Sequence, residues 1–159
     1  MVLTFLTVLD KERAVNGNGL MPTPYTPAWV LLPQPYADAV AAALAAGGTE
    51  VLDHWNDPMD PRDATVIARG ADGERLRFVW DEESGWRFGP MDADGWVALE
   101  DTRYLPLGLL PAPEEIARAV RAVIAGTEHG TAERPFHRSF RDYGDGLDAR
   151  LAAYGPAEA

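Results

Sequence analysis

Two segments of the chain carry complete helix start and stop signals, and the stretch between them carries none. Pro35 begins an alanine-rich segment that ends at Gly47, and Pro113 begins a second segment that ends at Gly126. Proline is favoured in the first turn of a helix, and glycine is favoured just past the end. The sequence therefore predicts helices over residues 36–46 and 113–125.

Both predicted helices have one apolar side. In the first helix, Tyr36, Val40 and Leu44 recur every fourth residue. In the second helix the apolar side consists of Ile116, Val120, Val123 and Ile124. An amphipathic helix is stable when its apolar stripe is buried against another element. We therefore expect both helices to pack on a common core.

The stretch between the helices consists of short segments of strand-forming residues separated by turn residues. The expected strands are residues 49–54, 64–69, 74–80, 86–88 and 96–100. The link from Gly70 to Gly73 contains Asp-Gly, which is typical of a hairpin turn. The pattern predicts an antiparallel meander of about four or five strands. The expected fold class is α+β, in the order helix, meander, helix, followed by a partly helical tail.

The length of 159 residues, of which 47% are hydrophobic, suits one core. We expect an N-terminal arm over 1–34, a core domain over 35–126 and a tail over 127–159. The arm has strand formers at 2–9 and an apolar anchor at 29–32, so it either joins the sheet or stays unattached. The tail is expected to be either a third packing element or a docking segment for another chain, through Phe136, Phe140, Tyr143, Leu147 and Leu151.

The charge balance disfavours one class of partner. The net charge is -11, and nucleic-acid binding depends on basic patches that release counterions from phosphates. The same charge suits a protein partner, in particular a basic one, and leaves a homo-oligomer open. No apolar run is long enough to span a bilayer, and no basic residue precedes the apolar stretch at 2–9. We therefore expect no membrane contact and a cytoplasmic location.

Catalytic and metal motifs are absent from the sequence. The chain has no cysteine, which excludes thiol nucleophiles and thiolate metal sites. His54, His129 and His137 have no spacing that would bring them onto one metal ion. A nucleophile elbow, a phosphate-binding loop and a dinucleotide fingerprint are also missing. The sequence predicts neither a metal nor a cofactor, and a non-enzymatic role is favoured over an enzymatic one.

The best candidate site is the loop between the first two expected strands. Two Asp-Pro steps hold residues 57–61 in extended geometry, and stiff loops at a sheet end often carry binding groups. Tryptophans beside the loop form either an aromatic floor for a ligand or part of the core. Arg62 either pairs with the acidic turn at 81–83 or belongs to the site. The candidate binding residues are Trp55, Asp57, Arg62, Asp63, Trp80 and Trp86.

Three short motifs carry a resemblance to a known family. They are Trp-Asn-Asp-Pro at 55–58, Pro-Arg-Asp-Ala-Thr at 61–65 and Trp-Asp-Glu-Glu-Ser-Gly-Trp at 80–86. Over about residues 35–125 the chain resembles an uncharacterised actinobacterial domain family of unknown function. The resemblance implies a small α+β domain in a bacterial cytoplasm and brings no known activity.

These observations favour a non-enzymatic, acidic protein-interaction or regulatory module whose sheet face and tail contact a protein partner. The alternative is a small-molecule-binding protein or small enzyme with a tryptophan-lined pocket at the sheet end. A concave pocket with convergent polar groups would favour the small-molecule-binding protein or enzyme, and a flat apolar patch would favour the protein-interaction module.

We predict that the full chain does not bind duplex DNA at physiological salt, because its net negative charge repels phosphates. A gel-shift titration measures this, with a basic DNA-binding protein as the positive control. Salt-sensitive binding at micromolar concentration would contradict the prediction and reveal a local arginine patch.

Overall fold

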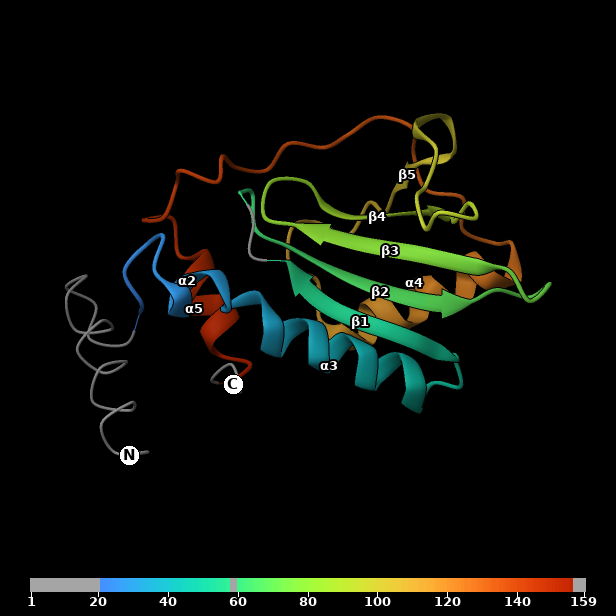
Figure 1. The fold of residues 1–159 in the computed structure, drawn as a ribbon, viewed down its shortest axis with the longest axis horizontal. Coiled ribbons are helices and arrows are strands. Elements are labelled where there is room, and N and C mark those ends of the chain that lie inside the picture. The colour runs from blue at the N-terminus through green and yellow to red at the C-terminus, as the bar shows by residue number, and fades with distance from the viewer. Residues whose placement is uncertain (1–20, 58–59, 156–159) are drawn as a thin grey trace.

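A computed structural model describes residues 21–57 and 60–155 of the chain. The elements follow the expected order of helix, strand meander, helix and partly helical tail (Figure 1). The elements are α2 (Pro27–Val30), α3 (Pro33–Ala46), β1 (Val51–Asp57), β2 (Asp63–Arg69), β3 (Arg75–Asp81), β4 (Gly85–Pro90), the 3-10 helix η1 (Leu99–Asp101), β5 (Arg103–Tyr104), α4 (Pro113–Ala125) and α5 (Leu147–Ala152).

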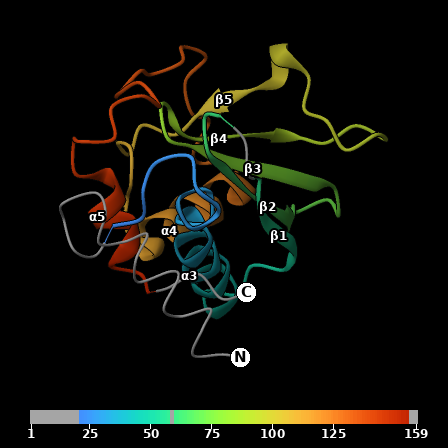
Figure 2. The same cartoon turned by 60° about the vertical axis from the view of Figure 1, so that its left-hand side comes forward.

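The strands form one antiparallel sheet in the order β1-β2-β3-β4-β5. This is the predicted meander, and the α+β fold class is confirmed. Helices α3 and α4 lie together on one face of the sheet (Figure 2). We call the opposite face of the sheet its outer face.

Alternation along the strands separates the two faces. On β2 and β3, the cross-strand pairs Ala64–Trp80 and Val66–Phe78 bury their side chains under the helices. The intervening pair Thr65–Val79 belongs to the outer face, because successive side chains of a strand point to opposite sides. The same alternation places Trp55 of β1 and Arg87 of β4 on the outer face.

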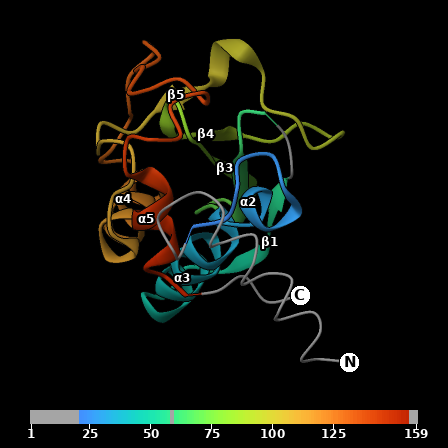
Figure 3. The same cartoon turned by 90° about the vertical axis from the view of Figure 1, so that its left-hand side faces the viewer.

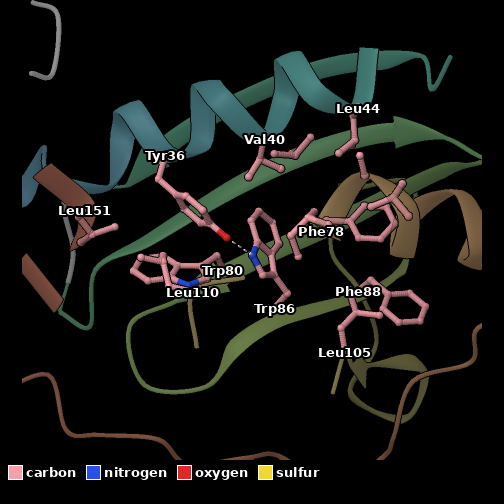
Figure 4. Packing of buried hydrophobic residues seen from close by; sticks show 14 of the residues in the cluster. Tyr36, Val40, Leu44, Phe78, Trp80, Trp86, Phe88, Leu105, Leu110 and Leu151 are labelled. Carbon is pink, nitrogen blue, oxygen red and sulfur yellow. Dashed lines mark hydrogen bonds between the residues drawn. The ribbon is translucent and has the colours of Figure 1, made fainter. Parts of the chain in front are cut away.

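The core between sheet and helices is organised around Tyr36 of α3 (Figure 4). The Tyr36 hydroxyl donates a hydrogen bond of 2.6 Å to the carbonyl of Pro111 and accepts one of 3.1 Å from the indole of Trp86. Burial raises the pKa of the Tyr36 phenol, so the hydroxyl keeps the proton that it donates. One side chain thus connects α3 with β4 and with the segment before α4.

Both helix predictions are confirmed. The predicted helix over 36–46 lies inside α3, which begins earlier, at Pro33. The predicted helix over 113–125 coincides with α4, and Gly126 follows it with a φ of 80°. Glycine adopts this left-handed conformation without the steric cost that other residues meet.

The first strand differs from its prediction. Residues 49–54 were expected to form it and 55–63 to form a loop, whereas β1 runs from Val51 to Asp57. The ladder continues until Asp57 lies opposite Asp63. Cross-strand pairing thus extends the strand to the first Asp-Pro step and shortens the loop.

The predicted strand over 96–100 is wrong. The carboxylate of Asp92 accepts hydrogen bonds from the backbone N–H groups of Asp94 and Trp96, which makes a turn, and η1 follows. The segment instead packs on the outer face. A Cβ atom at Gly89 would lie 2.3 Å from Val97, so glycine is what allows this close approach.

The described parts of the arm and the tail both join the core. Trp29 and Leu32 of the arm are buried, and so are Leu147 and Leu151 of the tail. Helices α2 and α5 lie at the same end of the molecule (Figure 3). The expected strand formers at 2–9 lie outside the described residues. None of the helices within 21–57 and 60–155 has the length and apolar character of a membrane span.

Burial corrects part of the docking prediction for the tail. Leu147 and Leu151 face the core from α5, so a partner cannot contact them. Phe140 is half-buried, whereas Phe136 and Tyr143 are exposed. Only these three aromatic residues of the predicted docking tail are accessible.

Candidate functional site

The structure excludes two of the predicted site residues. Trp80 and Trp86 are fully buried on the helix-covered face of the sheet. The indole of Trp80 donates a hydrogen bond of 2.7 Å to the carbonyl of Leu109, and Trp86 donates to Tyr36. Their polar atoms are therefore satisfied inside the protein. The expected tryptophan-lined pocket is corrected to a tryptophan-filled core.

Arg62 is also buried, with no exposed surface. Its guanidinium donates to both carboxylate oxygens of Glu82, at 2.9 and 3.1 Å, and to Asp148 at 2.7 Å. It also lies 3.8 Å from the ring centre of Trp29, over the ring face. Arg62 is thus a structural residue. It pairs with the acidic turn at 81–83, which is one of its two expected roles, and its burial leaves no surface for the other role, contact with a ligand.

A second arginine extends this cluster. Arg138 of the tail donates to Glu82 at 2.8 Å and to Asp145 at 2.5 Å. Burial raises the pKa of Asp145, but the hydrogen bonds from Arg138 and from the backbone of Leu147 outweigh it and lower the pKa. We call the five residues the ion network: Arg62, Glu82, Arg138, Asp145 and Asp148.

The remaining three predicted residues come together on the outer face at the sheet end. Asp57 of β1 lies opposite Asp63 of β2. The Trp55 indole donates a hydrogen bond of 3.1 Å to the Asp57 carboxylate. One oxygen of Asp63, Oδ1, is buried and has no hydrogen-bond partner. The structure therefore leaves one acidic side chain incompletely satisfied.

The pKa of Asp63 is raised to about 6. Burial is the largest cause, and the neighbouring negative charge of Asp57 is the second. Arg87 opposes the rise, while a hydrogen bond with Asp57 and the charge of Asp81 add to it. The Asp63 carboxyl group therefore holds its proton at a higher pH than an ordinary aspartate does, because burial and the charge of Asp57 both disfavour its ionised form.

Asp63 lines a pocket of about 300 Å³. We call it the Asp63 pocket; its lining residues are Asp60, Pro61, Asp63, Asp81, Arg87, Tyr104 and Arg134. Both arginines are already engaged. Arg87 donates to Asp81 at 2.7 Å, and Arg134 donates to Ser84 at 2.6 Å. Asp63 is thus the group in this pocket that has the most to gain from a ligand.

A smaller pocket of about 120 Å³ adjoins it, because Arg87 lines both. We call this second pocket the Arg77 pocket; its lining residues are Arg77, Val79, Arg87, Phe88, Trp96, Val97 and Thr102. The Arg77 guanidinium lies between two indoles, 5.6 Å from the ring centre of Trp55 and 5.3 Å from that of Trp96.

Sequence reasoning missed most of the pocket. Tyr104 comes from β5 and Arg134 from the tail, and the topology alone brings them to the end of β2. The pairing of Asp81 with Arg87 could have been predicted from the sequence, because the two residues flank the tight turn between β3 and β4.

Metal binding has no support in the part of the chain that the structure describes. No group of three or more histidine or acidic residues there is arranged to hold an ion. His54, on exposed β1, instead contacts Asp38 of α3 at 3.0 Å.

A model of a family of unknown function (DUF6292) matches residues 36–122, more than half of the chain. The chain belongs to this family. The expected resemblance to a family of unknown function is thereby confirmed. No curated protein and no solved structure matches the chain.

The DUF6292 match includes the whole sheet and ends within α4. It contains Asp63, Arg77 and the buried pair of Arg62 and Glu82. The other partners of Arg62, which are Trp29 and Asp148, lie outside the matched residues.

We predict that Glu82→Gln lowers the free energy of unfolding by about 3–5 kcal/mol, because it leaves two buried guanidinium groups without their shared carboxylate. Urea unfolding measures the loss. The matched control is Glu50→Gln, which breaks the exposed ion pair with Arg69 and should cost at most about 1 kcal/mol. Equal losses in the two variants would contradict a structural role for the ion network.

We predict that Asp63→Asn stabilises the protein by about 1 kcal/mol near pH 7.5, after allowance for solvent screening of this half-buried side chain. The folded-state pKa lies above the ordinary value of 3.8, so ionisation of Asp63 costs stability as the pH rises from about 4 to about 6. Thermal unfolding across this range should show the gain disappearing near pH 4. A gain that persists at pH 4 would contradict this assignment.

Proposed function

We propose that this protein is a non-enzymatic binding module that takes a basic side chain of a protein partner into the Asp63 pocket. The observation that carries the proposal is the Asp63 carboxyl group, which has an unpartnered buried oxygen and lies beside a second carboxyl group. A guanidinium or ammonium group placed in the pocket would lie beside the Asp63 carboxyl group and offset the repulsion between Asp57 and Asp63.

The charges around the pocket support a cation as the ligand. Arg87 is neutralised by Asp81 and Arg134 lies near Glu83, so neither arginine is free to pair with Asp63. Asp60 adds another acidic side chain to the pocket wall. The net charge of -11 also attracts a basic partner over long range and speeds encounter.

The proposal includes a regulatory aspect and a compartment. Protonation of Asp63 near pH 6 would weaken binding of a cation, so the module would release its partner as the pH falls. The resemblance to a bacterial family favours the cytoplasm of an actinobacterium as its location.

A second candidate is a small-molecule-binding protein or small enzyme. It is favoured by the volume of the Asp63 pocket and by a carboxyl group whose pKa is close to neutral, which is common at functional sites. A small cationic molecule would use the same contacts as a basic side chain.

The test compares two short peptides that differ in one residue: a central arginine or its neutral isostere citrulline. We predict that the arginine peptide binds about tenfold more tightly near pH 7.5, because only its guanidinium is charged. Amide chemical shifts of the labelled protein measure affinity and place the peptide. Arginine amide serves as the small-molecule probe, and if it binds as tightly as the peptide the second candidate is favoured.

Two variants and a change of pH complete this test. Asp63→Asn should remove the preference for arginine, whereas Asp72→Asn, which removes an equal charge from the hairpin at the opposite end of β2, should keep it. Lowering the pH to about 5 should weaken binding because Asp63 is then protonated; the charged groups facing Asp63 are Asp57, Asp81 and Arg87. Equal affinity for arginine and citrulline would refute the proposed function.

A further inference from the structure

Arg77 is a cation on the outer face without an acidic partner in the described part of the chain. Its guanidinium donates a hydrogen bond of 3.0 Å to the carbonyl of Gly95 and is flanked by the indoles of Trp55 and Trp96. These contacts hold the group in place but leave its positive charge unpaired. Arg87, its neighbour in the same pocket, is by contrast paired with Asp81.

The Arg77 pocket combines this charge with apolar walls. Val79, Phe88 and Val97 line it, and its lining contains no acidic residue. A guanidinium group binds carboxylates through parallel hydrogen bonds, and the interaction strengthens where water is partly excluded. The chemistry of this pocket therefore suits a carboxylate. The indole of Trp96, which is 65% exposed, offers an aromatic surface beside it.

A second polar atom near this pocket is also unsatisfied. Thr65 is fully buried on the outer face, directly across from Val79, and its hydroxyl has no hydrogen-bond partner. Trp55 lies on the other side of Thr65 in the same cross-strand row. Neighbouring side chains cover this hydroxyl, and Thr65 is not part of the lining of either pocket.

The sheet register sets the distance between the two pockets. Arg77 lies opposite Ile67, which is four residues beyond Asp63 on β2. At about 3.3 Å per residue, the Cα positions of Asp63 and Ile67 are about 13 Å apart along the strand. An extended peptide has the same rise, and its residues i and i+4 point to the same side. A strand-like peptide can therefore reach both pockets with side chains four residues apart.

We infer that the partner segment is an extended peptide that carries a basic residue for the Asp63 pocket and, four residues away, a carboxylate for the Arg77 pocket. The inference rests on the proposed function, because the basic residue is the one proposed above. Charge complementarity supports such a peptide, because the Asp63 pocket has an incompletely satisfied carboxyl group and the Arg77 pocket has a cation without an acidic partner in its lining. Arg87 lines both pockets, so the two sites for the peptide side chains adjoin.

The experiment uses the full chain and synthetic peptides with one arginine. Glutamate is placed four residues from the arginine, in either order, and is compared with glutamine at the same position. In the better of the two orders, the glutamate peptide should bind about fivefold more tightly than the glutamine peptide. With a spacing of three residues the preference should vanish, because the carboxylate then points away from the sheet.

Variants assign the carboxylate preference to Arg77. Arg77→Gln should abolish the preference for glutamate over glutamine while keeping the preference for arginine over citrulline. Arg77→Lys, which keeps the positive charge, should retain part of the preference for glutamate. The matched control is Arg75→Gln, which removes an exposed charge from the same face of β3 outside the pocket. Thermal unfolding of each variant shows whether it is folded.

The outcomes separate the two proposals. If arginine is preferred over citrulline but glutamate and glutamine bind equally, the inference about the carboxylate fails and the proposed function stands. If arginine is not preferred, the proposed function fails and the inference fails with it. If Arg75→Gln removes the glutamate preference as fully as Arg77→Gln does, the general charge of the face is responsible, which also overturns the inference.

Discussion

The buried guanidinium of Arg62 is the group on which the arrangement of the chain depends. It contacts Glu82 after β3, Trp29 of α2 and Asp148 of α5. A buried charge is tolerated only when it is paired and hydrogen-bonded, so these three segments must all be in place around it. Arg138 adds a further link from the tail to Glu82. These contacts thereby connect α2, α5 and the tail segment at Arg138 to one end of the sheet.

The same network positions the candidate site through the alternation of the strands. Asp63 directly follows Arg62, and Asp81 directly precedes Glu82. Because successive side chains of an extended chain point to opposite sides, a buried pair of Arg62 and Glu82 directs Asp63 and Asp81 outward, into the Asp63 pocket. The ionic contacts thus hold the pocket acids close together despite the repulsion between their charges. Of the acidic side chains at this end of the sheet, Glu82 pairs with buried Arg62, whereas Asp63 and Asp81 line the Asp63 pocket. Their positions in the sequence do not reveal this difference.

Local signals predicted most of the fold, and long-range contacts decided the rest. Proline and glycine at the helix ends and the turn at 70–73 led to both long helices and the central hairpin. The strand expected over 96–100 is an exception, because a local turn around Asp92 replaces it and Gly89 leaves room for Val97 on the outer face. Loop composition made Asp57 and Asp63 candidates for a site. The sequence around Arg62, however, does not reveal whether this side chain faces solvent or a buried acid. Tyr104 and Arg134 reach the site only through the tertiary fold.

The carboxylate of Asp148 accepts hydrogen bonds from both the Trp29 indole and Arg62, at 2.9 and 2.7 Å. Two of these three residues, Trp29 and Asp148, lie outside the part of the chain that the family model matches. The burial of Arg62 therefore depends on segments outside the matched residues. In the evolution of related chains, loss of the acid in the tail would select for a compensating change at the position of Trp29 or of Arg62. These three positions should accordingly change together.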